Sequence, residues 1–340
     1  MNEQTAINFT PKDFATDQEV RWCPGCGDYA ILKGVQKALA DIGTPPENVV
    51  FVSGIGCAAR FPYYVETFGF HTIHGRAPAF ATGIKLANPE LDVWIVSGDG
   101  DSLSIGGNHL MHVLRRDVDV NYLLFNNEIY GLTKGQASPT SRMGTRSPST
   151  PAGSVDHPLS PCVTALGVGA RFVARGIDRG QKELPGILQR AHDHKGASFV
   201  EILQNCIVYN DGIFDSVTDK SVSDFAQVHV QHGEPLLFGP ENKMGLHLNP
   251  KTLRLEVVEL GENGVSLDDV IVHDETNRML AQMLAGMERP DFPVAVGVLY
   301  NNPADVTYEA AVARQNETMA HQARIKTVSE LLHSGSTWTV

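Results

Sequence analysis

Residues 92–100 read Asp-Val-Trp-Ile-Val-Ser-Gly-Asp-Gly, a short apolar run that leads directly into an acidic residue between two glycines. A run of this length that ends in glycine is typical of a strand buried on both faces. Residues 48–53 and 120–125 repeat the pattern, and each also ends in a glycine-rich or asparagine-rich turn. Residues 170–174 and 198–203 are further candidate strands. The sequence therefore predicts a sheet whose strands are largely buried.

Segments whose apolar residues have helical spacing lie before or between these strands. The spacing is clearest over residues 28–42, where Gly43 and two prolines end the pattern, and it recurs over 105–116 and 183–194. Strands that alternate with helices predict an α/β fold with a mostly parallel sheet flanked by helices. In such a sheet ligands bind at the carboxyl ends of the strands, which is where the glycine-rich and asparagine-rich turns lie.

The composition excludes several kinds of partner. The 340 residues are 42% hydrophobic and 19% charged, which is typical of a globular protein. A formal net charge of −12 gives no general attraction to nucleic acid or to an anionic membrane. We find no signal peptide and no apolar run of roughly 20 residues, so we expect a cytoplasmic protein without membrane partners. Five cysteines in a reducing compartment are not expected to form disulfides.

The chain divides into three parts by its pattern. We expect residues 1–20 to be an N-terminal arm and residues 21–210 to form the α/β domain, which includes a long Ser/Thr/Pro/Gly-rich loop at 138–161. The alternation weakens after residue 210. We therefore expect residues 211–340, with one helix over 309–333, to be a C-terminal extension for subunit contacts.

The run Gly98-Asp99-Gly100 is followed by Asn126-Asn127, with one helix and one strand between them. Glycines allow the backbone to approach a phosphate closely. A carboxylate, an amide oxygen and a backbone carbonyl form the all-oxygen set that Mg²⁺ prefers, and a diphosphate would complete its coordination. A lone Gly-Asp-Gly is usually an ordinary loop, but the joint occurrence after two buried strands favours a Mg²⁺–diphosphate site.

Four of the five cysteines occur in short motifs that suggest metal binding. Cys23 and Cys26 form a Cys-x-x-Cys pair, Cys57 lies in Gly-Ile-Gly-Cys, and Cys206 follows the last clear strand. Four thiolates suit zinc or an iron–sulfur cluster. One pair with two single cysteines favours a cluster, without excluding zinc or, for the pair alone, a redox dithiol. Cys162 fits none of these patterns and is interpreted as a structural thiol.

These motifs together resemble a known family. The Gly-Asp-Gly and Asn-Asn pair resembles the thiamine-diphosphate motif, and residues 20–210 resemble the β subunit of the 2-oxoacid:ferredoxin oxidoreductases. The resemblance rests on Cys23-Pro-Gly-Cys-Gly27, Gly54-Ile-Gly-Cys57, His74-Gly-Arg-Ala77 and Tyr130-Gly-Leu-Thr-Lys-Gly-Gln136. It implies the thiamine-diphosphate-binding fold, with thiamine diphosphate, Mg²⁺ and one [4Fe–4S] cluster as cofactors.

The resemblance also implies roles for single residues. The side chains of Asp99 and Asn127 and the carbonyl of Ile129 would bind Mg²⁺. Cys23, Cys26, Cys57 and Cys206 would hold the cluster. The residues that would contact thiamine diphosphate are Ile55, Gly56, Cys57, Ala58, His74, Gly100, Asp101, Gly131 and Leu132.

Arg60 and Lys134, together with Leu132, are expected to face the substrate. A 2-oxo dicarboxylate needs cations for both of its ends, and residues 131–140 resemble the 2-oxoglutarate branch of the family. The implied activity is oxidative decarboxylation of 2-oxoglutarate with coenzyme A to succinyl-CoA and CO₂, with the reverse carboxylation also possible. Pyruvate, a branched-chain 2-oxoacid or indolepyruvate is the alternative substrate. A zinc-stabilised, non-catalytic binding protein is the alternative from a different class.

The resemblance implies that the chain acts with partners. An α subunit would supply the glutamate that activates the pyrimidine ring of thiamine, together with contacts to coenzyme A. Ferredoxin would accept the electrons from the cluster. We expect an α₂β₂ assembly in which this chain alone is inactive.

Overall fold

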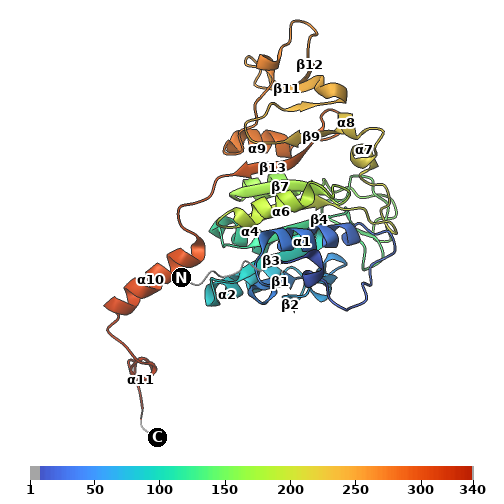
Figure 1. The fold of residues 1–340 in the computed structure, drawn as a ribbon. Coiled ribbons are helices and arrows are strands. Elements are labelled where there is room, and N and C mark those ends of the chain that lie inside the picture. Colours follow the sequence, from blue (N-terminus) through green and yellow to red (C-terminus); the bar gives the residue numbers. More distant parts are fainter. Residues whose placement is uncertain (1–7, 339–340) are drawn as a thin grey trace.

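The computed structural model describes residues 8–338, and its centre is an eight-stranded sheet (Figure 1). Every neighbouring pair of strands is parallel except β7 and β13, which are antiparallel. The predicted mostly parallel α/β sheet is therefore confirmed. The strands run in the order β2 (Phe68–His71), β1 (Val49–Ser53), β3 (Asp92–Gly98), β4 (Asn121–Asn126), β8 (Ser198–Leu203), β7 (Phe172–Ile177), β13 (Val294–Asn301) and β9 (Gln227–Val230).

The apolar runs form the middle strands of this sheet, where helices cover both faces. All residues of β1, β4, β7 and β8 are buried, as expected for parallel strands between layers of helices. The register aligns the carboxyl ends: Ser53 of β1 lies opposite Val96 of β3, Gly98 of β3 opposite Phe125 of β4, and Asn126 of β4 opposite Leu203 of β8. The loops that leave four neighbouring strands therefore start from one edge.

Two apolar layers hold the helices to the sheet. α1 (Asp28–Ile42) and α6 (Leu184–Asp193) pack on one face, where their buried side chains join Phe51 and Trp94 (Figure 1). Pro185 lies in the first turn of α6, where a backbone N–H has no helical partner to lose. The opposite face is covered by α2 (Ala77–Ala87), α4 (Gly107–Arg116), α5 (Pro161–Gly167) and α9 (Arg278–Ala285).

The short elements lie in the connections. These are η1 (Pro11–Phe14), η2 (Pro46–Asn48), η3 (Ala58–Tyr63), α3 (Asp99–Leu103), β5 (Ile129–Tyr130), β6 (Gln136–Ala137), α7 (Asp215–Thr218), α8 (Ser223–Ala226), η4 (Pro240–Asn242) and η5 (Leu267–Asp269). Residues 1–7 of the expected N-terminal arm lie outside the described residues. The rest of the arm is packed onto the domain, because Phe14 is fully buried in the α1 layer.

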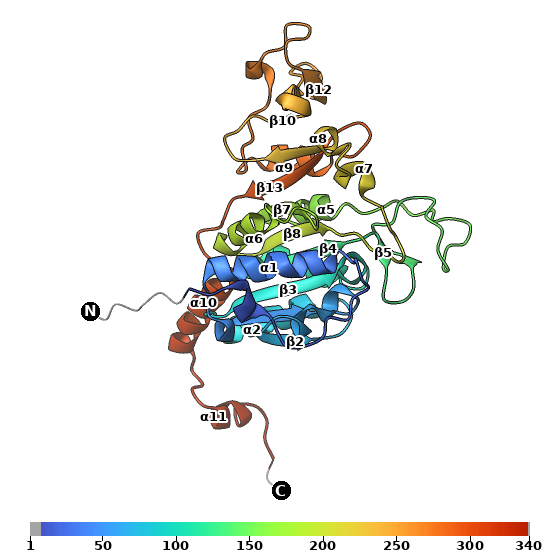
Figure 2. The same ribbon diagram turned by 45° about the vertical axis from the view of Figure 1, so that its right-hand side comes forward.

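The sheet continues beyond residue 210, into the part that the sequence predicts as an extension. β9 and β13 form its far edge, and the antiparallel strands β10 (Leu237–Phe238), β11 (Met244–Leu248) and β12 (Leu255–Glu259) form a small second sheet between them in sequence. The end of the chain leaves the domain as two helices, α10 (Tyr308–Gln322) and α11 (Val328–Leu332) (Figures 1 and 2). One continuous helix over 309–333 was therefore wrong: a capping box at Thr327 starts a new helix. None of the helices within residues 8–338 combines the length and the apolar composition that a membrane span requires.

Candidate functional site

Loops that follow β1, β2, β3, β4 and β8 meet at the carboxyl edge of the sheet. Together with residues 21–28 they line two adjoining cavities. The first cavity is lined by Ile55, Gly56, Cys57, Ala58, His74, Gly98, Asp99, Gly100, Asp101, Phe125, Asn127, Ile129, Tyr130, Gly131, Leu132 and Thr133. This set contains every residue that the resemblance assigns to thiamine diphosphate and to Mg²⁺.

Glycine is required at Gly100 in the first cavity and at Gly54 beside it, because other groups approach both closely. A Cβ on Gly100 would stand 2.3 Å from the ring of Tyr130, whose hydroxyl donates a hydrogen bond to the Gly100 carbonyl at 3.1 Å. A Cβ on Gly54 would stand 1.9 Å from the carboxylate of Asp101. Side chains at these positions would push apart the turns that form the wall of the cavity.

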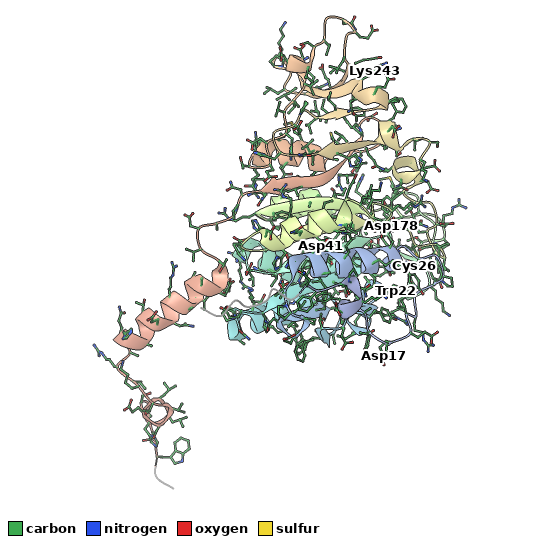
Figure 3. The ribbon with its side chains drawn as sticks, in the orientation of Figure 1. Asp17, Trp22, Cys26, Asp41, Asp178 and Lys243 are labelled. Carbon is green, nitrogen blue, oxygen red and sulfur yellow. The ribbon has the colours of Figure 1, made fainter. Side chains whose placement is uncertain are left out.

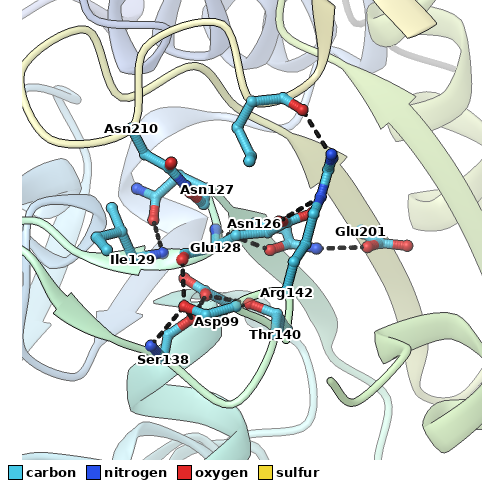
Figure 4. A network of polar contacts seen from close by, with 12 residues as sticks. Asp99, Asn126, Asn127, Glu128, Ile129, Ser138, Thr140, Arg142, Glu201 and Asn210 are labelled. Carbon is cyan, nitrogen blue, oxygen red and sulfur yellow. Dashed lines mark hydrogen bonds and ion pairs between the residues drawn. The ribbon is translucent and has the colours of Figure 1, made fainter. Parts of the chain in front are cut away.

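Asp99 is the buried acid of the Gly-Asp-Gly turn, and the long loop after β6 reaches it (Figure 4). Its Oδ2 accepts hydrogen bonds from the hydroxyls of Ser138, at 2.6 Å, and Thr140. Burial raises the pKa of Asp99, and these two hydroxyls partly offset the rise because they stabilise the ionised form. The loop thus helps to keep this carboxylate available for a cation.

Asn127 is held from three directions, and Figure 4 shows its contact with Ile129. Its Oδ1 accepts a hydrogen bond from the backbone N–H of Ile129 at 3.1 Å, and its backbone carbonyl accepts one from Asn210 Nδ2 at 2.9 Å. Its Nδ2 donates to Oε1 of Gln204 at 2.7 Å. The amide oxygen of Asn127, the carboxylate of Asp99 and the carbonyl of Ile129 are oxygen donors around one cavity, and this donor chemistry fits Mg²⁺.

Asp101 has a structural task at the edge of the first cavity. Its Oδ1 accepts hydrogen bonds from His74 Nδ1 at 2.6 Å, from Gly75 N at 2.9 Å and from Ile55 N at 3.3 Å, while Oδ2 accepts from Ser97 Oγ at 2.6 Å. One carboxylate therefore ties the loops after β1 and β2 to β3. His74 is half-exposed on the other side of this contact.

The second cavity contains all four of the predicted cluster ligands and has a volume of roughly 200 Å³. It shares Cys57, Asn127, Gly131 and Leu132 with the first cavity. A Cβ on Gly131 would lie 3.6 Å from both Cys57 Sγ and Cys206 Sγ, so this residue lies beside two of the four sulfurs. Figure 3 shows Cys26 at the start of α1, near Trp22. The remaining residues of the lining are Arg21, Cys23, Asp28, Arg60, Gln204, Ile207, Val208 and Tyr209.

Burial and nearby negative charge keep two thiols of the second cavity in the protonated form when no metal is bound. Burial raises the pKa of Cys57 to about 12 and also raises that of Cys26, so these groups stay protonated until a cation replaces the proton. In residues 8–338 no three His, Cys, Asp or Glu side chains stand close enough to hold one metal ion. Four thiols around one cavity are the donor set of a [4Fe–4S] cluster, so the residues present fit that group.

The other singled-out residues lie in different places. Arg60 lines the second cavity and donates a hydrogen bond to the Arg21 carbonyl at 3.2 Å. Lys134 lies on the exposed turn between β5 and β6 and lines neither cavity. Cys162 is fully buried on α5 and donates to Glu201 Oε2 at 3.0 Å, which agrees with a structural thiol. Its partner Glu201 is also paired with the buried Arg175.

Sequence reasoning missed four residues that organise the site. Ser138 and Thr140 bind Asp99, whereas Gln204 and Asn210 fix Asn127. Ser138 and Thr140 stand in a segment that carries the family resemblance, which was a usable signal. Gln204 and Asn210 belong to no motif, so only the fold reveals them.

The fold and the site together define a thiamine-diphosphate-binding domain with an adjoining cavity lined by cysteines. The family model for the C-terminal TPP-binding domain of thiamine pyrophosphate enzymes matches residues 54–202. The 2-oxoglutarate oxidoreductase subunit KorB of Mycobacterium tuberculosis is 47% identical over 97% of this chain and 88% of that protein. A 2-oxoacid:ferredoxin oxidoreductase subunit beta of Saccharolobus solfataricus is 36% identical over 87% of this chain and 86% of that protein.

A solved structure of 2-oxoglutarate:ferredoxin oxidoreductase from Magnetococcus marinus has the same fold, with a TM-score of 0.77. It is 30% identical in sequence, and the match covers 98% of each chain. This chain therefore belongs to the β subunits of the 2-oxoacid:ferredoxin oxidoreductases, as the sequence motifs predict.

Proposed function

We propose that this chain is the β subunit of a 2-oxoglutarate:ferredoxin oxidoreductase. The complex would decarboxylate 2-oxoglutarate, transfer the succinyl group to coenzyme A and pass electrons to ferredoxin; the reverse carboxylation would use the same site. The similarity to subunit KorB over nearly the whole chain supports the choice of 2-oxoglutarate. The similar structure from Magnetococcus marinus has 2-oxoglutarate, coenzyme A and succinyl-CoA bound, which supports the same substrates here.

The observation that carries the proposal is the shared wall between the two cavities. Cys57, Asn127, Gly131 and Leu132 line both. A thiamine enzyme without redox chemistry needs only the first cavity. An adjoining set of four cysteines would place an electron acceptor directly beside the carbon that loses CO₂.

The residues have distinct tasks in this proposal. Thiamine diphosphate, when bound, supplies the electron sink for decarboxylation. The carboxylate of Asp99, the side-chain oxygen of Asn127 and the carbonyl of Ile129 would hold Mg²⁺ against the diphosphate. Arg60, beside the cysteines, would bind one substrate carboxylate, and Lys134, on the exposed turn that follows Leu132, would bind the other.

Leu132 would shield the reacting carbon from water. It is 45% exposed and lies between the two cavities. Cys23, Cys26, Cys57 and Cys206 would hold one [4Fe–4S] cluster, which transfers electrons one at a time.

The proposal requires a second chain. No glutamate of residues 8–338 lines the first cavity, and by family resemblance an α subunit provides the glutamate that activates thiamine, together with contacts to coenzyme A. We propose an α₂β₂ assembly that docks ferredoxin. The exposed apolar residues of α10 and α11, which leave the domain, would contribute to subunit contacts.

The test is to purify the chain together with its α partner under anaerobic conditions. We expect about four iron and four sulfide per β chain, and higher kcat/KM with 2-oxoglutarate than with pyruvate or branched-chain 2-oxoacids. Replacing Cys206 with alanine should remove most of the iron, whereas Cys162→Ala should retain it. Zinc without sulfide would overturn the redox function, and equal or better rates with pyruvate would overturn the choice of substrate.

A further inference from the structure

Gln204 is a buried amide between the two cavities. It follows the last residue of β8, is only 1% exposed, and lines the second cavity. Its Oε1 accepts a hydrogen bond from Asn127 Nδ2 at 2.7 Å, and its Nε2 donates to Cys26 Sγ at 3.2 Å and to the Asn205 carbonyl at 2.7 Å. One side chain therefore joins a residue of the first cavity to a cysteine of the second.

The orientation of both amides follows from backbone groups whose hydrogen-bonding roles are fixed. The backbone N–H of Ile129 can only donate, so the atom of Asn127 that faces it is Oδ1. Nδ2 of Asn127 then faces Gln204, which must present Oε1. The carbonyl of Asn205 can only accept, so the atom of Gln204 on that side is Nε2. The donor to Cys26 is therefore an N–H group.

The backbone holds this side chain firmly in place. The N–H of Gln204 donates to the Asn126 carbonyl at 2.8 Å, which continues the pairing of β8 with β4. The N–H of Gly27, next to Cys26, donates to the Asn205 carbonyl at 3.1 Å. The start of α1 and the ends of β4 and β8 are thus connected through two consecutive residues.

We infer that Gln204 is a positioning residue that couples the two cofactor sites, an inference that rests on the proposed function. Through Oε1 it fixes the rotamer of Asn127, so that Oδ1 points toward the metal site. Through Nε2 it donates a hydrogen bond to the thiolate of Cys26 when a cluster is bound. Hydrogen bonds to cluster sulfurs stabilise the more negative, reduced state and raise the reduction potential.

The two halves of this role can be separated by substitution. Gln204→Met keeps the length of the side chain and removes all three of its hydrogen bonds, including those with Asn127 and Cys26. Gln204→Glu keeps an oxygen that accepts from Asn127 and, when ionised, removes the N–H donor to Cys26. Asn210→Ala is the matched control, because the Asn210 side chain donates to the Asn127 carbonyl at 2.9 Å and to no sulfur.

The experiment measures two properties of the complex of this chain with its α partner, and neither is turnover. The first is the cluster potential, from a redox titration followed by electron paramagnetic resonance. The second is the affinity for thiamine diphosphate with Mg²⁺, from calorimetry. Gln204→Met should make the equilibrium for one-electron reduction about tenfold less favourable, which corresponds to about 59 mV, and should weaken cofactor binding several-fold. Gln204→Glu should lower the potential and keep cofactor affinity within about twofold. Asn210→Ala should leave the potential unchanged and weaken cofactor binding.

Each alternative outcome has one meaning. An unchanged potential in both Gln204 variants would overturn the inference, and so would a shift in Asn210→Ala equal to that in Gln204→Met. Absence of iron and sulfide from the unsubstituted complex would instead overturn the proposed function.

Discussion

The hydroxyl of Ser138 donates a hydrogen bond of 2.6 Å to Oδ2 of Asp99, although 39 residues separate them along the chain. Thr140 donates to the same oxygen. The loop that begins after β6 is thereby attached to the acid that we assign to Mg²⁺. The neighbouring Ser141 adds a contact with the Glu128 carbonyl, on the turn that carries Asn127. The start of this loop is part of the site (Figure 4), whereas most of residues 142–159 are exposed.

Ser138→Ala and Thr140→Ala should therefore weaken Mg²⁺ binding in a pH-dependent manner. Both hydroxyls lower the pKa of Asp99, and burial raises it. Their loss raises the pKa further, so more of the carboxyl is protonated at low pH and cannot bind a cation. A hydrogen bond to a charged group contributes roughly 1.5–3 kcal/mol, so affinity should fall at least tenfold at pH 6 and less at pH 8. Calorimetric titration with Mg²⁺ and thiamine diphosphate at both pH values measures this, with Ser149→Ala on the exposed part of the loop as the control. A loss of equal size at pH 6 and pH 8 would contradict the explanation.

The sequence predicted most of the sheet and both cavities for one physical reason. Strands β1, β3, β4 and β8 are buried on both faces, so their sequences are continuous apolar runs, and each is followed by a turn with its own motif. Motif residues such as Asp99, Cys57 and Gly131 are near in sequence to these runs. Parallel pairing then places them together without any further information.

Other features depend on contacts that no local pattern records. β13 pairs with β7 across more than 100 residues, so the sequence offered no reason to extend the sheet beyond residue 210. Gln204 and Asn127 are 77 residues apart, and both are ordinary polar residues until β8 pairs with β4. The position of Lys134 has a different cause. Its φ of +78° belongs to a tight turn that places the side chain outside the cavities of this single chain.

Asp28 should make stability depend on pH. It is fully buried beside the cysteines, and burial raises its pKa from 3.8 to about 7. The unfolded chain loses this proton near pH 4 while the folded chain keeps it, so the folded state loses stability as the pH rises from about 4 to 7. Asp28→Asn removes this pH dependence, because asparagine carries no titrating proton. The difference in free energy of unfolding between the variant and the unsubstituted protein should therefore shift in favour of the variant from pH 5 to pH 7.5, on a scale of about 1.36 kcal/mol per pKa unit. Thermal unfolding at several pH values measures it, with the exposed Asp41→Asn on the same helix as the control. A constant difference across this range would show that the charge of Asp28 is not responsible.

Lys134→Gly tests the choice of substrate with little disturbance of the fold. Glycine accepts the positive φ of this position more easily than lysine, so the variant should fold at least as well. If the ammonium binds the second carboxylate, kcat/KM for 2-oxoglutarate should fall tenfold or more, because a charge-assisted contact is lost. The value for pyruvate should stay within about twofold. Steady-state rates with both substrates in the assembled complex measure this, and Lys251→Ala on the distant β11–β12 hairpin should change neither. Equal losses with the two substrates would remove Lys134 from substrate selection.

The C-terminal helices should matter for assembly and not for the fold of the domain. α10 begins in contact with the domain: Glu309 is buried and accepts a hydrogen bond from Asp119 N at 3.3 Å, and the Tyr308 ring lies under the guanidinium of Arg116. Beyond residue 312 the side chains are nearly all exposed, including Val328, Leu331 and Leu332. Exposed apolar residues on a segment that leaves the domain indicate a protein contact surface.

Deletion of residues 313–340 should leave the unfolding midpoint of the isolated chain unchanged and lower the mass of the complex in multi-angle light scattering. Leu331→Asp with Leu332→Asp should have the same effect, and Glu317→Ala none. An intact complex in both altered forms would show that this segment contributes nothing to assembly.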